Sequence, residues 1–319
     1  MTAEEESGTA QDGRDDAAAE DFFTRHRELL FAVAYNILGT VSDTEDVLQE
    51  TWLSWTSARR SAIADPRSYL VRIAVNEALG RLRRARGRRE VYVGPWLPEP
   101  LVTRPPETGP HPAEDVAEAV GRAESVSLAL MVVLETLTPL ERAVFVLREV
   151  FGYEHVEIAE ILGRSPAAVR QLAHRAREHV QARRPRYEPD PRVRRAATDR
   201  FLAASLGGDL GALMEVLAPD VALWTDGGGK RRAALRPIEG REKVARLLVA
   251  LSGMYAGDLD VRHVDVNAAP AAVVFGSAVF AVLVVDLDPR DDRVCGIYGV
   301  INPDKLGSAR EALSIVSCP

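Results

Sequence analysis

Residues 153–184 constrain the fold most, because they read as a helix, a short turn and a second helix. Gly163 permits a sharp turn, Ser165 is a good N-cap, and Pro166 suits the first helical position. The second helix has an apolar side made of Val169, Leu172, Ala173, Ala176 and Val180. Its other side carries long donors, as a helix in the DNA major groove requires: Arg170, Gln171, His174, Arg175 and Arg177. The alternative is a solvated basic helix in an ordinary bundle.

Charge is unevenly distributed along the 319 residues, whose formal net charge is −7. Residues 1–21 contain eight acidic residues and one arginine, which accounts for the whole excess, and we expect a disordered acidic tail over residues 1–19. Residues 67–89 contain eight arginines and one glutamate, and residues 164–186 contain seven arginines and one glutamate. A single stripe of this kind is usually a solvated helix face, but two of them favour two contacts with one polyanion.

Composition also excludes several classes of protein. The chain has no run of about 18 apolar residues, so we expect no membrane span, and its acidic start does not resemble a signal peptide. Cys295 and Cys318 are isolated, which argues against a disulfide framework or a zinc site and is consistent with a reducing cytoplasm. We predict no metal, no cofactor and no catalytic residues.

Three helices are expected in a first domain over residues 20–90. The first covers residues 20–38 and ends at Gly39. The second begins at a capping box of Ser42 and Glu45 and runs to about Arg59, and the third begins at Asp65 and Pro66. The third helix ends in a run of arginines. Its predicted buried side consists of Leu70, Val71, Ala74, Val75, Ala78, Leu79 and Leu82.

A proline-rich linker follows over residues 91–115. Trp96 and Leu97 are unusual in a linker, and they either dock on another part of the protein or pack locally on the preceding helix. A second helical domain is expected over residues 116–186, with a capping box at Thr138 and Glu141 before the helix-turn-helix.

From residue 187 onward, helices come first and strands afterwards, which predicts an α+β domain with a mainly antiparallel sheet. The expected helices cover residues 192–206, 209–217 and 242–251. The expected strands cover residues 221–225, 261–266, 272–275, 279–285 and 294–301.

The first two domains resemble those of an extracytoplasmic-function sigma factor of bacterial RNA polymerase. The matching segments are SDTEDVLQETWLSW at residues 42–55, DPRSYLVRIAVNEALGRLRRARGRR at residues 65–89, and residues 137–180. The resemblance implies that residues 42–55 bind the clamp of the largest polymerase subunit, that residues 65–89 read and open the −10 element, and that residues 137–180 read the −35 element. A plain DNA-binding regulator is a weaker alternative, because residues 42–55 match the clamp-binding helix.

Site residues follow from this resemblance and from side-chain chemistry. The core-binding set is Asp43, Asp46, Gln49, Glu50, Trp52 and Leu53, whereas Trp55 is expected in the core. The −10 set is Arg67, Arg72, Asn76, Arg83 and Arg84, in which Asn76 is either functional or a structural amide. The −35 set is Arg164, Ser165, Arg170, Gln171, His174, Arg175 and Arg177.

The remainder resembles the cone-shaped SnoaL-like (NTF2-like) domain of one subgroup of these sigma factors. Its short signatures correspond to WLPEP at residues 96–100, DGGGK at residues 226–230 and NPDKL at residues 302–306. The resemblance implies an intramolecular contact with the linker and the sigma domains that regulates transcription, with an unknown small ligand as a candidate effector. The residues assigned to this contact are Trp96, Leu97, Pro98, Asp226, Gly227, Gly228, Gly229, Lys230, Asn302, Pro303, Asp304 and Lys305.

One alternative belongs to another class: a DNA-binding protein fused to a SnoaL-like enzyme of the isomerase or hydrolase type. His263 and Asp265 share a strand face, and Asp226 lies on a turn, so an acid–base pocket is conceivable. Isolated residues of this kind on strands are more often structural or solvated.

Overall fold

The computed structural model describes residues 3–89, 91–103, 126–183, 189–254 and 259–314. They form two compact units. Of the described residues, unit 1 contains those within 3–85 and 137–177, and unit 2 contains those within 86–103, 126–136 and 178–314. This division does not follow the predicted domains, because the start of the linker and a short helix after it belong to the same unit as the C-terminal strands.

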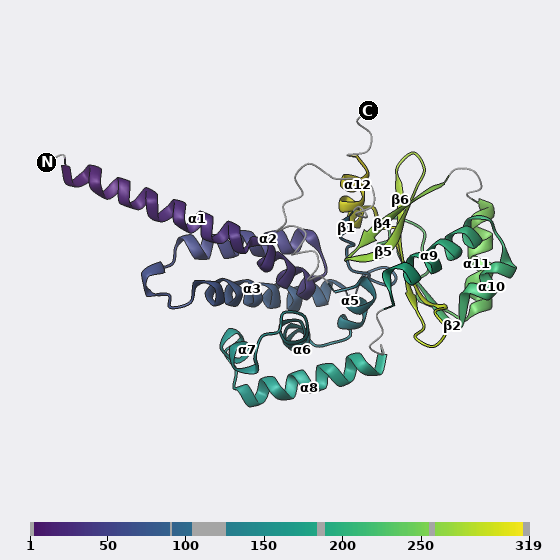
Figure 1. The fold of residues 1–319 in the computed structure, drawn as a ribbon, viewed down its shortest axis with the longest axis horizontal. Coiled ribbons are helices and arrows are strands. Elements are labelled where there is room, and N and C mark those ends of the chain that lie inside the picture. Colours follow the sequence, from purple (N-terminus) through teal and green to yellow (C-terminus); the bar gives the residue numbers. More distant parts are fainter. Residues whose placement is uncertain (1–2, 90, 104–125, 184–188, 255–258, 315–319) are drawn as a thin grey trace. The chain divides into compact units, whose positions relative to one another are not determined.

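Unit 1 is helical (Figure 1). Its elements are α1 (Ala3–Leu38), α2 (Val41–Thr56), the short 3-10 helix η1 (Arg60–Ala62), α3 (Pro66–Arg89, which continues into unit 2), α6 (Pro139–Phe145), the π-helical η3 (Val146–Val150), α7 (His155–Leu162) and α8 (Pro166–Arg183, which also continues into unit 2). Arg142 is a buried cation in this unit, and its Nε donates to the carbonyl of Asn36 at 3.1 Å.

Two expectations for the first helices differ from the structure. Helix α1 begins at Ala3 and includes most of the segment expected to be a disordered tail. Alanine and glutamate favour helix, and acidic side chains near a helix N-terminus interact well with its dipole. The capping box at Ser42 is wrong, because Thr40 is the N-cap of α2 and its hydroxyl donates to Asp43 Oδ2 at 2.8 Å. Gly39, with φ of 79°, ends α1 so abruptly that α2 begins at Val41.

The start and the buried side of α3 are confirmed. The Asp65 carboxylate accepts hydrogen bonds from the Ser68 hydroxyl and from the backbone N–H groups of Ser68 and Arg67, and these bonds lower its pKa. All seven residues predicted on the apolar side of α3 are buried. Arg67, Arg72, Arg83 and Arg84 are exposed on the rest of the helix surface.

The helix-turn-helix is also confirmed. Thr138 and Glu141 form the predicted capping box at the start of α6. Gly163 adopts a left-handed conformation with φ of 60° and ends α7. Ser165 Oγ accepts from the N–H of Ala168 at 3.2 Å and caps α8.

Unit 2 is built around one sheet. Its elements are β1 (Val102–Thr103), α5 (Leu128–Leu134), α9 (Pro191–Leu206), α10 (Leu210–Val216), β2 (Leu217–Asp226), β3 (Ile238–Glu239), α11 (Arg241–Met254), β4 (Asp260–Val266), β5 (Ala269–Phe275), β6 (Val279–Leu287), β7 (Val294–Val300), the 3-10 helix η4 (Pro303–Lys305) and α12 (Gly307–Ser314). All five predicted strands and all three predicted helices of this part are confirmed. The sequence did not indicate β1, β3, η4 and α12.

The sheet has the strand order β1-β4-β5-β6-β7-β2-β3. Every neighbouring pair is antiparallel except β2 and β7, which run parallel with Trp224 opposite Tyr298 and Asp226 opposite Val300. Parallel pairing places the C-terminal ends of β2 and β7 side by side. The segments after these two strands, DGGGK and NPDKL, therefore begin at the same end of the sheet.

Each face of the sheet has its own apolar core. Helices α9, α10 and α11 cover one face, where Phe201, Leu213 and Val244 are buried (Figure 1). The other face is covered by the linker, α5 and α12, through Leu97, Leu128 and Ala309 among others. We name these the helical face and the linker face. Because side chains alternate along a strand, each strand contributes to both cores.

Candidate functional site

The predicted core-binding residues lie on α2, and they fall into two groups. Gln49, Glu50 and Leu53 are exposed. The other three make local contacts: Asp43 accepts from Thr40, Asp46 pairs with Arg81 at 2.8 Å, and Trp52 packs edge-on against Phe23 at 5.1 Å between ring centroids. Trp55 is buried in the core as predicted, and its Nε1 donates to the carbonyl of Ala19.

All five predicted −10 residues are exposed on α3. Arg72, Asn76 and Arg83 lie at spacings of four and seven residues, which places them on one side of the helix. The Asn76 amide donates to the carbonyls of Arg72 at 2.8 Å and Ile161 at 3.2 Å. These bonds favour the structural alternative for Asn76, whereas the arginines extend into solvent.

The predicted −35 residues lie at the N-terminus and along the outer side of α8. Arg164, Ser165, Arg170, Gln171, His174 and Arg175 are exposed, and Arg177 is half-buried. Two of the arginines form ion pairs within unit 1: Arg175 Nε with Glu141 at 3.2 Å, and Arg177 with Glu149 at 2.6 Å. Arg170 and Gln171 therefore form the more accessible part of this surface.

The three signature segments meet at one buried carboxylate, that of Asp226. Its Oδ2 accepts from Lys305 Nζ at 2.7 Å and from the N–H of Leu97 at 2.9 Å, and its Oδ1 accepts from the Tyr92 hydroxyl at 2.6 Å. Lys305 also donates to the carbonyl of Leu97. One ion pair thus satisfies both backbone polar groups of a linker residue whose side chain is buried in the core of the linker face.

The aromatic residues of the linker complete this site. Lys305 Nζ lies 4.0 Å from the ring centroid of Trp96 and 5.2 Å from that of Tyr92, within the range of cation–π attraction. Burial, followed by the hydrogen bond to Asp226, raises the pKa of Tyr92. Trp96 and Leu97 therefore dock on the C-terminal domain, which is the first of the two alternatives stated for them.

The glycine turn after β2 permits close packing against the NPDKL segment. A Cβ on Gly228 would lie 2.3 Å from Asn302 Nδ2, and Gly228 has φ of 59°. Asn302 Nδ2 instead donates to the Tyr92 hydroxyl at 2.9 Å, and Asn302 Oδ1 accepts from the N–H of Asp304. On the surface of the same two segments, Lys230 pairs with Asp304 at 2.6 Å.

A second set of contacts, which no sequence motif predicted, holds the linker further along. Asn267, in the turn between β4 and β5, accepts from the N–H of Leu101 and donates its own N–H to the Leu101 carbonyl. Ser308 donates to the carbonyl of Pro100 at 2.5 Å. The linker then pairs with β4 as β1, where Val102 lies opposite Val266. An asparagine between two strands is typical of a two-residue hairpin turn, but it does not indicate a contact with the linker.

Helix α5 belongs to the segment expected to start the second helical domain, yet it packs on the linker face of the sheet. Leu128 and Ala129 are buried in that core, and Asn267 Nδ2 lies 3.5 Å from Met131 Sδ. The Thr136 hydroxyl lies 3.3 Å from His179 Nε2 of α8. The C-terminal sheet therefore binds both the linker and the helix that follows it.

The residues considered for an acid–base pocket are not brought together. Strand β2 places Trp224 on the linker face, and Asp226, two residues later, lies on the same face. Strand β4 places Val261 on the helical face, and the same alternation puts His263 and Asp265 there too. Two of these residues contact α9 instead. His263 Nδ1 lies 3.4 Å from Asp199, and Asp265 lies 4.0 Å from Arg195.

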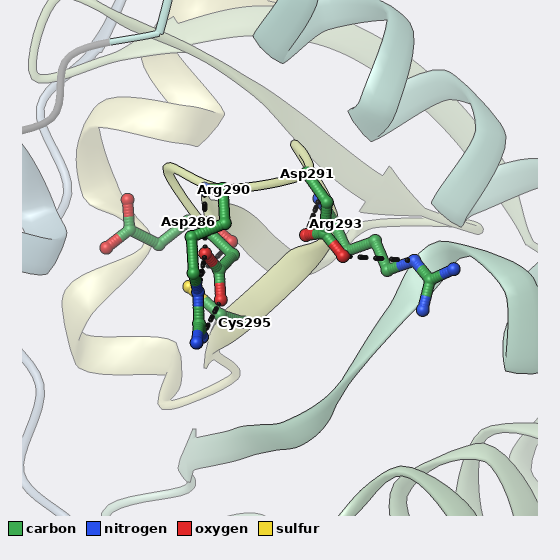
Figure 2. A network of polar contacts seen from close by, with 6 residues as sticks. Asp286, Arg290, Asp291, Arg293 and Cys295 are labelled. Atoms are coloured by element: carbon green, nitrogen blue, oxygen red, sulfur yellow. Dashed lines mark hydrogen bonds and ion pairs between the residues drawn. The ribbon is translucent and has the colours of Figure 1, made fainter.

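A polar network closes the hairpin between β6 and β7 (Figure 2). Arg290 donates to both oxygens of Asp288, which lowers the pKa of Asp288 to about 2. Arg293 pairs with Asp291 at 3.4 Å. Burial and then the nearby Asp286 raise the pKa of the Cys295 thiol to about 12, and Cys295 Sγ lies 3.5 Å from the Asp286 carbonyl oxygen (Figure 2).

Within the described ranges, no group of three or more His, Cys, Asp or Glu side chains is arranged to hold a metal ion. A search of the same residues for a helix long and apolar enough to cross a membrane finds none. Cys318 lies outside the described residues.

Known families and proteins resemble the chain over most of its length. The family model described as Sigma-70 region 2 matches residues 22–88, and that described as Sigma-70, region 4 matches residues 127–180. ECF RNA polymerase sigma factor SigJ of Mycobacterium tuberculosis is 39% identical over 294 residues, which cover 89% of this chain and 92% of SigJ. Sigma factor SigG of the same species is 29% identical over 307 residues, or 87% of this chain and 79% of SigG.

A solved structure extends the likeness to the C-terminal domain. The crystal structure of SigJ superposes with a TM-score of 0.69 and 35% sequence identity, covering 91% of this chain and 98% of that one. The C-terminal unit corresponds to the predicted SnoaL-like fold. The chain therefore belongs to the ECF RNA polymerase sigma factors, the alternative sigma factors that direct core RNA polymerase to specific promoters.

Proposed function

We propose that the SnoaL-like domain regulates this sigma factor in cis by binding the segment that joins region 2 to region 4. The observation that carries the proposal is the buried contact of Asp226 and Lys305 with Leu97. We name this contact, together with Tyr92, the latch. A separate regulatory subunit is not required in this scheme, because the contact lies within one chain.

The latch suits regulation because it acts on the linker. Region 2 and region 4 read promoter elements at a fixed spacing, so the path of the linker determines whether both are engaged at once. The domain also binds α5, the first helix of region 4. A domain that holds these two segments can alter the spacing of the DNA-reading domains without contacting DNA itself, and a small ligand that favoured one latch state would shift transcription.

Matched variants in transcription assays with core polymerase test the latch. The buried-pair variant combines Asp226→Asn with Lys305→Met. The control variant combines Lys230→Met with Asp304→Asn and removes an exposed ion pair that joins the same two segments. The two side chains of that pair are 56% and 60% exposed. Hydrogen exchange at the Leu97 N–H reports whether the linker is released. We expect the buried-pair variant to release the linker and to change transcription several-fold in one direction, which gives the sign of regulation, while the control stays near wild type.

The proposal fails if the released variant transcribes as the wild type does. Because transcription by the wild type is measured in the same assay, this outcome is separate from loss of sigma activity.

We also assign roles to the exposed side chains of the two sigma regions. Gln49, Glu50 and Leu53 of α2 would bind the polymerase clamp, with Asp43, Asp46 and Trp52 supporting the helix. Arg67, Arg72, Arg83 and Arg84 of α3 would follow the −10 strand, and Arg170, Gln171 and His174 of α8 would approach −35 bases, with Arg164, Ser165, Arg175 and Arg177 near phosphates. The exposure of Gln49, Glu50 and Leu53 on α2, of these four arginines on α3, and of Arg170, Gln171 and His174 on α8 supports these roles.

We further propose that the SnoaL-like domain has no enzymatic activity and that the protein acts in the cytoplasm, where polymerase and promoter DNA are found. The separation of His263 and Asp265 from Asp226 on opposite faces of the sheet supports the first point. Sigma-factor homology supports both.

A further inference from the structure

A basic loop of the SnoaL-like domain follows the glycine turn. Residues 230–236 read KRRAALR, with four cations and no acidic residue. Arg232 and Arg236 are exposed, Lys230 pairs with Asp304, and the Arg231 guanidinium lies over the Phe280 ring and donates to the Phe280 carbonyl. Among the residues that the structure describes, neither Arg232 nor Arg236 forms an ion pair. The latch does not use these two arginines.

The loop lies against the beginning of the linker. A Cβ on Gly94 would be 3.3 Å from the Ala234 carbonyl oxygen, and a Cβ on Gly229 would be 3.4 Å from Val93. These distances place the Gly94 backbone beside the backbone of Ala234, and the Val93 side chain beside Gly229. The contact fixes the loop relative to residues 91–94, which follow the arginine-rich end of α3 almost directly.

Chain geometry limits how far the loop can be from DNA bound by α3. Gly94, where the loop contacts the linker, lies ten chain steps after Arg84, and five of these steps are helical up to Arg89. At about 1.5 Å per helical residue and about 3.4 Å per extended residue, this separation is at most roughly 25 Å. One turn of duplex DNA spans about 34 Å, so the length of the chain keeps this contact within about one turn of the DNA segment beside Arg84.

We propose that Arg232 and Arg236 bind backbone phosphates of promoter duplex DNA beside the segment bound by α3. The partner is a phosphate backbone, because guanidinium groups suit phosphate oxygens and a segment without acidic residues presents no repulsive charge to DNA. The SnoaL-like domain would then be a third DNA-binding element of the sigma factor, whose contribution is independent of base sequence. The position of this element rests on the proposed role of α3 at the −10 element.

The test uses holoenzyme formed with core polymerase and a promoter duplex that the wild-type holoenzyme transcribes, selected from a random library. The loop variant carries Arg232→Ala and Arg236→Ala together. It is compared with a control variant that carries Arg200→Ala and Arg246→Ala together. The control pair removes the same charge from exposed positions on α9 and α11, which cover the helical face. Promoter affinity is measured against salt concentration, and affinity for core polymerase is measured separately.

Loss of two phosphate contacts lowers the slope of log affinity against log salt by about 2, at roughly 0.9 per contact. We expect this change in the loop variant, with affinity lowered several-fold, the control slope unchanged and core binding unchanged. An unchanged slope overturns the proposal. A loss confined to core polymerase binding also overturns it, since the loop would then contact an acidic protein surface.

A third variant separates this proposal from the assignment of α3. If Arg72→Ala with Arg83→Ala leaves promoter binding intact while the loop variant loses its salt dependence, the α3 assignment fails and the loop assignment stands. If the α3 variant loses promoter binding and the loop variant does not, the loop proposal fails alone.

Discussion

Lys305 Nζ lies 2.7 Å from Asp226 Oδ2, and the two side chains are 8% and 0% exposed. Both groups also bind the backbone of Leu97. A charge at this depth is stable only while its partner is present, because neither can be solvated. The linker therefore docks on an ion pair that the C-terminal domain forms between two of its own segments.

Removing one member of this pair is expected to cost more than removing both. Asp226→Ala and Lys305→Met should each lower the free energy of unfolding by about 3–5 kcal/mol, since each leaves a buried charge alone. The double variant should lose less than either single variant, and therefore less than the sum of the two. Urea unfolding measures all three. Additive losses would show that the two charges do not interact, and the exposed Lys230 and Asp304 pair should change stability by at most about 1 kcal/mol.

Gly228→Ala is expected to destabilise the SnoaL-like domain by about 1–3 kcal/mol. The new Cβ would meet Asn302 Nδ2, and the residue would be held at a positive φ. Gly253→Ala is the matched control, because Gly253 lies in α11 where an added Cβ would have nothing within 4 Å, and the change should stabilise the helix by up to about 1 kcal/mol. Equal thermal unfolding of the two variants would show that the close approach at Gly228 is unimportant.

Arg170→Ala is expected to weaken recognition of the −35 element by about 1–3 kcal/mol and to leave core polymerase binding intact. Arg170 is exposed on the outer side of α8. Holoenzyme binding to promoters with intact and altered −35 elements measures this effect. The assignment is removed if the variant and the wild type discriminate equally between the two promoters.

Leu53→Asp is expected to weaken binding to core polymerase by more than about 1 kcal/mol, since it places a charge in a predicted apolar contact. Leu53 is 52% exposed on α2. Val156→Asp makes a similar change at a residue that is 56% exposed on α7, and it should leave core binding unchanged. The affinity of each purified variant for core polymerase is the measurement, and equal losses would point to a general effect on folding.

The hairpin between β6 and β7 is expected to lose stability in acid. The pKa of Asp288 is about 2 in the folded protein and about 4 in an unfolded chain, because Arg290 binds the ionised carboxylate. The folded state therefore gains stability above about pH 4 and loses it as pH falls towards 2. Urea unfolding of the wild type and Asp288→Asn between pH 2 and 6 should give a difference that is constant above pH 4 and shrinks below it. A difference independent of pH would contradict this assignment.

The sequence predicted the helices and long strands well, because their periodicity and caps are local properties. The buried side of α3, the turn at Gly163 and the strands of the sheet all follow from such patterns. The two residues of β1 could not be predicted, since Val102 and Thr103 become a strand only by pairing with β4. The capping box at Ser42 failed because Thr40, two residues earlier, already begins the helix.

The candidate site was predictable as a set of motifs but not as an arrangement. Asp226, Lys305 and Leu97 were identified through resemblance, whereas their meeting depends on the parallel pairing of β2 with β7, which no local pattern encodes. Tyr92 and Asn267 were missed, since one lies in an apparent linker and the other in an ordinary turn. Their partners lie 134 and 166 residues away in the sequence.

The order of the latch residues along the chain has a consequence for synthesis. A ribosome makes region 2, the linker and region 4 first, then Asp226, and only later Lys305. Until Lys305 has emerged, the Asp226 carboxylate has no cation beside it, and the linker cannot be held in the way described. A nascent sigma factor would thus pass through an interval in which its promoter-reading regions are made but not yet restrained, and the length of that interval would depend on how fast the C-terminal domain is translated and folded.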